Sequence, residues 1–267
     1  MYWKQDPKKH VYVAAHRGAC AEYPENTMLA FQKALEAGVD QIETDVHMTA
    51  DGELVLIHDH RLERTTNGTG FVREHTLAEI KALDAGSHKG AEFAGIQVPT
   101  FRELMELIKD HPTMTLDVEL KDYPDGDLEE FSHTSCDKAI ALIEEYGFGD
   151  RVVINSWHNP LNEYVYKKYN GRYRQHLYFP RSCLQGPTTV DPYTYGYCAC
   201  MFGENDEPIA SAANCAAFRE MGIRTWVGAF VKDEQTVDMA LAVEAELITC
   251  NNPKTVVDIL RAKNLHP

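Results

Sequence analysis

The 267 residues of this chain include 41 acidic and 26 basic side chains, which give a formal net charge of −15. Because the acidic residues are spread along the chain, its surface disfavours nucleic acid and anionic membranes as partners. An anionic ligand would need local cations at its binding site. With 44% hydrophobic residues, the length suits one large α/β barrel or two small domains, and nothing in the composition indicates disorder.

Membrane association is also disfavoured. The sequence has no apolar stretch of membrane-spanning length, and its N-terminal segment MYWKQDPKKH has no apolar run. We therefore predict no stable membrane anchor. The seven cysteines are odd in number and scattered, without a C-x-x-C pair, which favours reduced thiols and a cytoplasmic location.

Short apolar runs alternate with helical patterns along the chain. The predicted strands are 11–15, 41–46, 113–120, 152–156, 175–179, 198–202, 223–229 and 246–250. The predicted helices are 27–37, with Asn26 as its N-cap, 100–109, 133–146, 160–169, 210–221, 233–242 and 253–263. Eight strand units predict an α/β protein with a (β/α)8 TIM barrel, in one domain over residues 1–267. Residues 181–197 are rich in Pro, Gly, Thr and Tyr, which indicates a long loop.

One interval, about residues 47–98, interrupts this alternation between the second strand and the helix that follows it. It opens with a turn at Thr49-Ala50-Asp51-Gly52, before a short strand at 53–57. A loop this long without structure is improbable in a compact domain. We therefore expect a small subdomain inserted at the mouth of the barrel.

Acidic side chains recur at strand spacing in two of the predicted strands. Alternation sends Glu43 and Asp45 to one face of the second strand, and Asp117, Glu119 and Lys121 to one face of the third. Three converging carboxylates, Glu43, Asp45 and Glu119, would repel one another without a cation. Oxygen ligands suit Mg²⁺ or Ca²⁺ better than Zn²⁺, so we infer one hard divalent cation.

Two histidines and an arginine lie near the ends of apolar runs in the same part of the chain. His16-Arg17-Gly18 ends the first predicted strand, and His58 follows the short strand in the interruption. Imidazoles exchange protons near neutral pH, and a guanidinium fork binds phosphoryl oxygens. Catalytic groups of barrel enzymes lie at the carboxyl ends of the strands, where these residues would fall. Together with the carboxylates they indicate phosphodiester chemistry.

The order and spacing of these motifs resemble the glycerophosphodiester phosphodiesterases, a family of the phospholipase C-like phosphodiesterase superfamily. The matching motifs are A-H-R-G (15–18), P-E-N-T (24–27), A-F-x-x-A (30–34), G-V-D-x-I-E-T-D-V (38–46), T-A-D-G (49–52), H-D (58–59), L-E-R-T-T-N-G-T-G (62–70), V-P-T-F (98–101), E-L-K (119–121), N-S-W (155–157) and T-W-V (225–227). Dense matches cover residues 11–121.

The resemblance implies metal-dependent hydrolysis of a small glycerophosphodiester to sn-glycerol 3-phosphate and an alcohol. It implies metal ligands at Glu43, Asp45 and Glu119, a general acid and base at His16 and His58, and substrate contacts from Arg17 and Lys121. It leaves open which histidine is the acid, and whether water or the neighbouring glycerol hydroxyl attacks first. The segment Thr249–Pro253 departs from the family, whose last strand often ends with Asp before a turn that contains Pro.

Trp226 is the remaining candidate for substrate binding. As an aromatic residue near a strand end, it could either fill the barrel or form a platform for glycerol. Three other functions stay open: a lysophospholipase D-type enzyme acting on lipids, a non-catalytic phosphoester-binding barrel, and a zinc hydrolase. The last would need His-rich ligands at strand ends, which this sequence does not offer.

Overall fold

The protein forms a closed barrel of parallel strands in the computed structural model, which describes residues 10–201, 203–204, 207–208 and 211–267. The barrel strands are β1 (Tyr12–His16), β2 (Gln41–Met48), β4 (Thr115–Leu120), β5 (Val152–Asn155), β6 (Arg174–Phe179), β7 (Cys198–Met201), β10 (Arg224–Ala229) and β11 (Leu247–Cys250). Strand β1 pairs in parallel with both β2 and β11, which closes the sheet.

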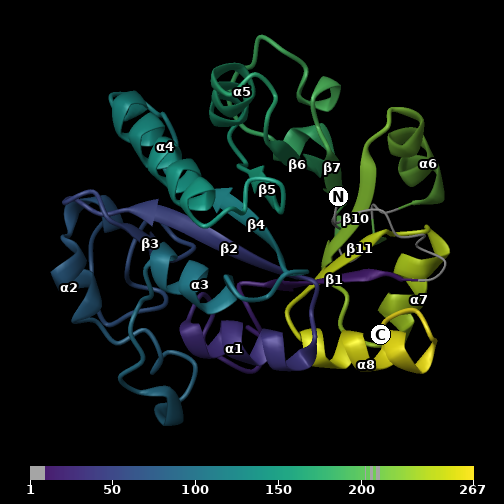
Figure 1. Cartoon of the computed structure of the whole chain (residues 1–267), viewed down its shortest axis with the longest axis horizontal. Coiled ribbons are helices and arrows are strands. Elements are labelled where there is room, and N and C mark those ends of the chain that lie inside the picture. The colour runs from purple at the N-terminus through teal and green to yellow at the C-terminus, as the bar shows by residue number, and fades with distance from the viewer. Residues whose placement is uncertain (1–9, 202, 205–206, 209–210) are drawn as a thin grey trace.

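Helices surround this barrel, as Figure 1 shows. They are α1 (Met28–Ala37), α3 (Phe101–Ile108), α4 (Glu129–Glu145), α5 (Asn159–Lys168), α6 (Ala212–Glu220), α7 (Glu234–Ala242) and α8 (Pro253–Ala262). Helices α1 and α8 lie side by side, which brings the two ends of the described chain to neighbouring parts of the barrel. The predicted (β/α)8 barrel is confirmed.

Two predicted helix starts are wrong. Helix α4 begins at Glu129 and not at 133, because Glu129 and Glu130 stabilise the positive end of the helix dipole although Leu128 provides no side-chain cap. The N-cap of α1 is Thr27, whose hydroxyl accepts a hydrogen bond from the backbone N–H of Ala30. Asn26, the predicted cap, lies one residue too early and serves the site described below.

The segment between β2 and α3 has local structure and a separate apolar cluster. It contains β3 (Leu54–Leu56), antiparallel to β2, the 3₁₀ turns Val72–Glu74 and Ala91–Phe93, and α2 (Leu77–Lys81). Buried side chains shared by these elements are Val55, Ile57, Leu62, Val72, Ile80, Ala85 and Val98. In Figure 1 the segment lies beside the carboxyl end of β2. It therefore carries its residues to the edge of the barrel mouth.

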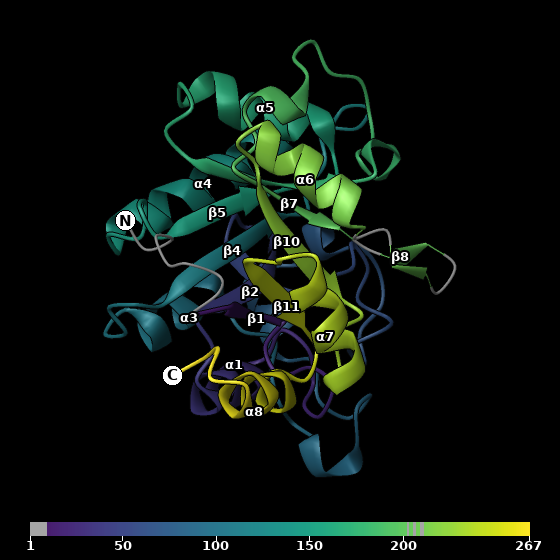
Figure 2. The ribbon, with the colours of Figure 1, turned by 90° about the vertical axis from the view of Figure 1, so that its right-hand side faces the viewer.

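The second half of the barrel contains fewer regular connections. Residues 181–197 form only the 3₁₀ turns Arg181–Cys183 and Pro192–Thr194 between β6 and β7. The short strands β8 (Gly203–Glu204) and β9 (Glu207–Pro208), which the sequence did not predict, form a hairpin that projects from the body in Figure 2. The predicted ends at 202 and 210 lie outside the described residues. None of the described helices is long and apolar enough to span a bilayer.

Candidate active site

A small cavity opens at the carboxyl ends of the barrel strands. Its volume is about 200 Å³, and its lining residues are His16, Arg17, Glu43, His58, Glu119, Trp157, His176, Tyr178, Cys200, Ala229 and Thr249. Seven of the eight barrel strands and the segments after β3 and β5 contribute to it. The sequence motifs near residues 16, 43, 58 and 119 therefore meet at one place.

Three buried carboxylates meet at one side of this cavity. Alternation along β2 and β4 turns Glu43, Asp45 and Glu119 toward the barrel interior, where one oxygen atom of each lies within 4.8 Å of the others. All three are at most 5% exposed. Lys121 pairs with Glu119, and its Nζ lies 3.1 Å from Oδ1 of Asp45. One ammonium group thus faces two of the three acids.

The carboxylates are not equally easy to ionise. Burial and then the charge of Asp45 raise the pKa of Glu43 well above its ordinary value. Burial likewise raises the pKa of Glu119, although Lys121 opposes the shift. Burial also raises the pKa of Asp45, but Lys121 and Arg17 outweigh it and hold that pKa below its ordinary value. Lys121 and Arg17 therefore do not stabilise the ionised forms of all three acids. The cluster suits an added divalent cation with oxygen ligands.

A tight turn after β1 holds Arg17 over these carboxylates. Arg17 and Gly18 have φ angles of 53° and 79°, and a Cβ at Gly18 would lie 2.7 Å from the backbone of Ala30. Only glycine fits there. The turn directs the backbone N–H of Arg17 to Oε2 of Glu43 at 2.8 Å and places its Nε 3.3 Å from Oδ2 of Asp45.

Asn26 orients one of the predicted metal ligands. Its Nδ2 donates to Oδ2 of Asp45 at 2.8 Å, and its Oδ1 accepts from the hydroxyl of Thr44 at 2.9 Å. The residue is 2% exposed and has a φ of 53°. Its place in the P-E-N-T motif gave no signal for this contact, which joins residues that are 19 positions apart.

His16 is held by the last loop of the barrel. Its Nδ1 donates to Oδ1 of Asn251 at 2.7 Å, which leaves Nε2 as the acceptor of the neutral ring, 4.0 Å from Oε2 of Glu43. Burial, with Arg17 as the second cause, lowers the pKa of His16 to about 4. The segment in which the chain departs from the family therefore positions His16.

His58 has a carboxylate partner instead. Its Nδ1 donates to Oδ1 of Asp59 at 2.6 Å. Arg64 donates to Asp59 at 2.6 Å and to Glu25 at 2.7 Å, and Glu25 also accepts from Arg17 at 3.0 Å. Burial lowers the pKa of His58, and Asp45 and Asp59 oppose that shift. A chain of alternating charges, through Asp59, Arg64 and Glu25, thus connects His58 to Arg17.

Trp226 is less directly placed. It is fully buried within the inner cluster of the barrel, which also contains Tyr12, Ala14, Val153, Tyr178, Leu184, Cys198, Cys200 and Leu247, and it does not line the cavity. Of the two roles open to it, this position favours filling the barrel.

The opposite wall contains residues to which the sequence analysis assigned no role. Trp157 stacks on Tyr178 with ring centres 3.9 Å apart, and the Tyr178 hydroxyl donates to Asn155 at 2.7 Å. His176 lines the same wall from β6. Its ring contacts both Tyr178 and Trp226 at centre distances of 4.9 and 5.0 Å. The N-S-W motif was a signal for Trp157, but β6 offered none for His176.

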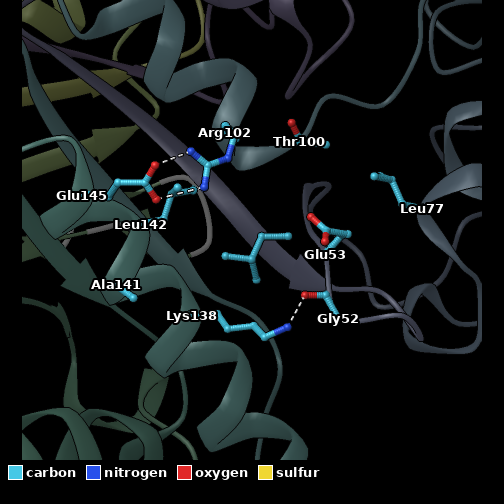
Figure 3. Close-up of a pocket in the computed structure, with 10 residues that line it drawn as sticks. Gly52, Glu53, Leu77, Thr100, Arg102, Lys138, Ala141, Leu142 and Glu145 are labelled. Carbon is cyan, nitrogen blue, oxygen red and sulfur yellow. Dashed lines mark hydrogen bonds and ion pairs between the residues drawn. The ribbon is translucent and has the colours of Figure 1, made fainter.

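Two other features, a histidine and carboxylate cluster and a surface groove, are weaker candidates for a functional site. His10, Asp40 and His266 gather near the amino end of β2, where both imidazoles hydrogen-bond to the Asp40 carboxylate at 3.1 and 3.0 Å. A larger groove of about 450 Å³ lies outside the barrel and is lined by α3, α4 and the turn before β3. Figure 3 draws its lining residues. Its cations are engaged within the groove, Arg102 by Glu145 and Lys138 by the carbonyl of Gly52.

Comparisons with known proteins point to one family. Residues 16–179 match the model of the glycerophosphoryl diester phosphodiesterase family. A glycerophosphodiester phosphodiesterase of Caldanaerobacter subterraneus is 47% identical over 151 residues, and one of Bacillus altitudinis is 39% identical over 149 residues. Each alignment covers 55% of this chain and only 58% of the relative's length.

Solved structures share the fold over nearly the whole chain. The glycerophosphodiester phosphodiesterase of Agrobacterium tumefaciens has a TM-score of 0.74 at 24% identity, covering 92% of this chain and 98% of its own. A phosphodiesterase of Oleispira antarctica, solved with the product sn-glycerol-3-phosphate, has a TM-score of 0.78 at 21% identity, covering 94% and 96%. With the family match over residues 16–179, the chain belongs to the glycerophosphoryl diester phosphodiesterase family.

Proposed function

We propose that this protein hydrolyses glycerophosphodiesters to sn-glycerol 3-phosphate and an alcohol. The observation that carries this proposal is the meeting of three buried carboxylates, an arginine and two imidazoles around one small cavity. Family membership supports the substrate class, as does the product bound to the Oleispira antarctica phosphodiesterase.

Glu43, Asp45 and Glu119 would hold one divalent cation, Mg²⁺ or Ca²⁺. The raised pKa values of Glu43 and Glu119 support this assignment, because a cation favours the ionised forms that burial disfavours. When bound there, the cation would supply charge neutralisation for the phosphoryl oxygens. Lys121 would compensate part of the negative charge of its ligands.

Arg17 would bind the phosphoryl group beside the carboxylates. Its side chain lines the cavity, and its contacts with Glu25 and Asp45 fix the direction of the guanidinium plane. A fixed guanidinium can hold phosphoryl oxygens in one orientation and stabilise the charge that develops on them.

The partners of the two histidines favour different proton-transfer roles. His16 has a neutral amide partner and a lowered pKa of about 4, so its Nε2 is a free-base acceptor at neutral pH. It would deprotonate the nucleophile. His58 has a carboxylate partner that stabilises the protonated ring, so it would protonate the leaving alkoxide.

The experiment is the release of glycerol 3-phosphate from glycerophosphocholine, glycerophosphoethanolamine and glycerophosphoglycerol. We expect turnover that EDTA abolishes and Mg²⁺ or Ca²⁺ restores. Lysophosphatidylcholine in the same panel tests the lipid alternative. Binding of these substrates without release of product would contradict the proposal and favour a binding barrel.

A further inference from the structure

A third histidine lies in the barrel wall opposite the proposed chemistry. His176 is on β6, is 4% exposed, and lines the same cavity as His16 and His58. The roles proposed above for proton transfer, metal binding and phosphate binding do not use it. An imidazole at this place in the cavity therefore needs another explanation.

A buried carboxylate fixes the tautomer of this ring. Nδ1 of His176 lies 2.7 Å from Oδ2 of Asp117, which is fully buried, and the other oxygen of Asp117 accepts from Asn155 at 2.6 Å. A carboxylate that accepts a hydrogen bond from Nδ1 places the ring proton on that nitrogen. In the neutral ring Nε2 is therefore a hydrogen-bond acceptor.

Nε2 has no hydrogen-bond partner among the residues that the structure describes, although it is buried. Because Asp117 engages Nδ1, Nε2 is the ring nitrogen left for a ligand in the cavity that His176 lines. A buried acceptor without a partner is costly unless a ligand supplies the missing donor.

We propose that Nε2 of His176 accepts a hydrogen bond from a hydroxyl of the glycerol group of the substrate. This inference rests on the proposed function. A cavity of about 200 Å³ encloses only part of such a diester. The neutral wall of Trp157 and Tyr178 suits the uncharged carbons of glycerol, and the charged wall suits the phosphoryl group. The variable alcohol would then face the open mouth, so His176 selects for the part that all these substrates share.

The test compares glycerophosphocholine with two analogues, each lacking one of its two free glycerol hydroxyls. We expect the wild-type kcat/KM to be at least about tenfold lower for one analogue, because that analogue leaves the buried acceptor unpaired. This measurement needs no variant. Equal kcat/KM values for the parent and both analogues would overturn the inference, whereas no release of product from any substrate would overturn the proposed function itself.

His176→Phe then locates the effect, since it keeps a ring but removes both nitrogens. We expect kcat/KM for the parent to fall about tenfold and the value for the sensitive analogue to change less than about twofold. His176→Gln, whose amide can still hydrogen-bond, is expected to keep part of the discrimination. If His176→Phe lowers kcat/KM equally for the parent and the analogue, the discrimination is unchanged and the role of His176 is structural, which would overturn the assignment. No loss on either substrate would overturn it as well.

Discussion

The two walls of the barrel mouth differ in charge and in how the sequence encodes them. The wall of β1, β2 and β4 carries charged groups that lie in short motifs, whereas the wall of β5 to β7 carries Trp157, His176, Tyr178 and Cys200, which are scattered through the chain. The first wall suits phosphoryl and cation chemistry, and the second suits the shape of a neutral group. The comparison indicates that charge chemistry and ligand selection are divided between the two walls.

The charged wall should be far more sensitive to substitution. We expect Glu43→Gln to lower kcat/KM by on the order of 10³-fold or more, because it removes the negative charge of a proposed metal ligand. Tyr178→Phe on the neutral wall should cost less than about tenfold, since it removes only a neutral hydroxyl that contacts Asn155 and, at 3.4 Å, Glu119. The matched control Glu36→Gln alters an exposed pair with Lys33 on α1. Similar losses for Glu43→Gln and Tyr178→Phe would remove the distinction between the walls.

The two histidines of the charged chemistry can be separated by the leaving group. We expect His16→Ala and His58→Ala each to lower turnover of glycerophosphocholine by about 10²-fold or more. With a p-nitrophenyl diester, which leaves without protonation, His58→Ala should recover most of its activity and His16→Ala should not. Recovery by His16→Ala instead would reverse the assignment of acid and base. Metal binding should change little in either variant.

Breaking the link between the inserted segment and the barrel should have a smaller effect on activity. Arg64→Met breaks the contacts of Arg64 with both Asp59 and Glu25, so His58 and Arg17 lose a shared support. We expect kcat to fall about tenfold, with a smaller change in KM. Arg61→Met is the control, because Arg61 lies in the same segment and pairs with Glu63 at the surface. An Arg64→Met enzyme as active as Arg61→Met would show that this support is dispensable.

The smallest expected effect is on the pH dependence of the free energy of unfolding. Burial and then His47 lower the pKa of His60 to about 4, from an ordinary value of 6.5. The unfolded chain therefore takes up a proton before the folded one does, and stability falls as the pH drops from about 6.5 to 4. We expect His60→Asn to reduce this acid loss by ~1–2 kcal/mol in denaturant titrations. The control is His111→Asn, at an exposed residue. Parallel pH profiles for the wild type and His60→Asn would contradict this reasoning.

The sequence predicted most of the fold and of the charged wall. Strand alternation was sufficient to bring Glu43 and Asp45 together, because both lie on one strand, and the ordered motifs connected them to Glu119 and the two histidines. The contact of His16 with Asn251 joins residues 235 positions apart, and that of His176 with Asp117 joins residues 59 apart. Local periodicity carries no information about such pairs, since they depend on the stagger of strands in the closed barrel. For the same reason, the sequence could not distinguish a Trp226 in the barrel interior from one at the mouth.

The central claim is that Glu43, Asp45 and Glu119 bind one divalent cation at the mouth. Calorimetric titration of the metal-stripped protein with Mg²⁺ and with Ca²⁺ tests it directly, using Asp45→Asn and the matched variant Asp40→Asn from the His10 and His266 cluster. We predict one site per chain in the wild type and in Asp40→Asn, and its loss in Asp45→Asn. Undiminished binding in Asp45→Asn, or loss of binding in Asp40→Asn alone, would contradict the claim.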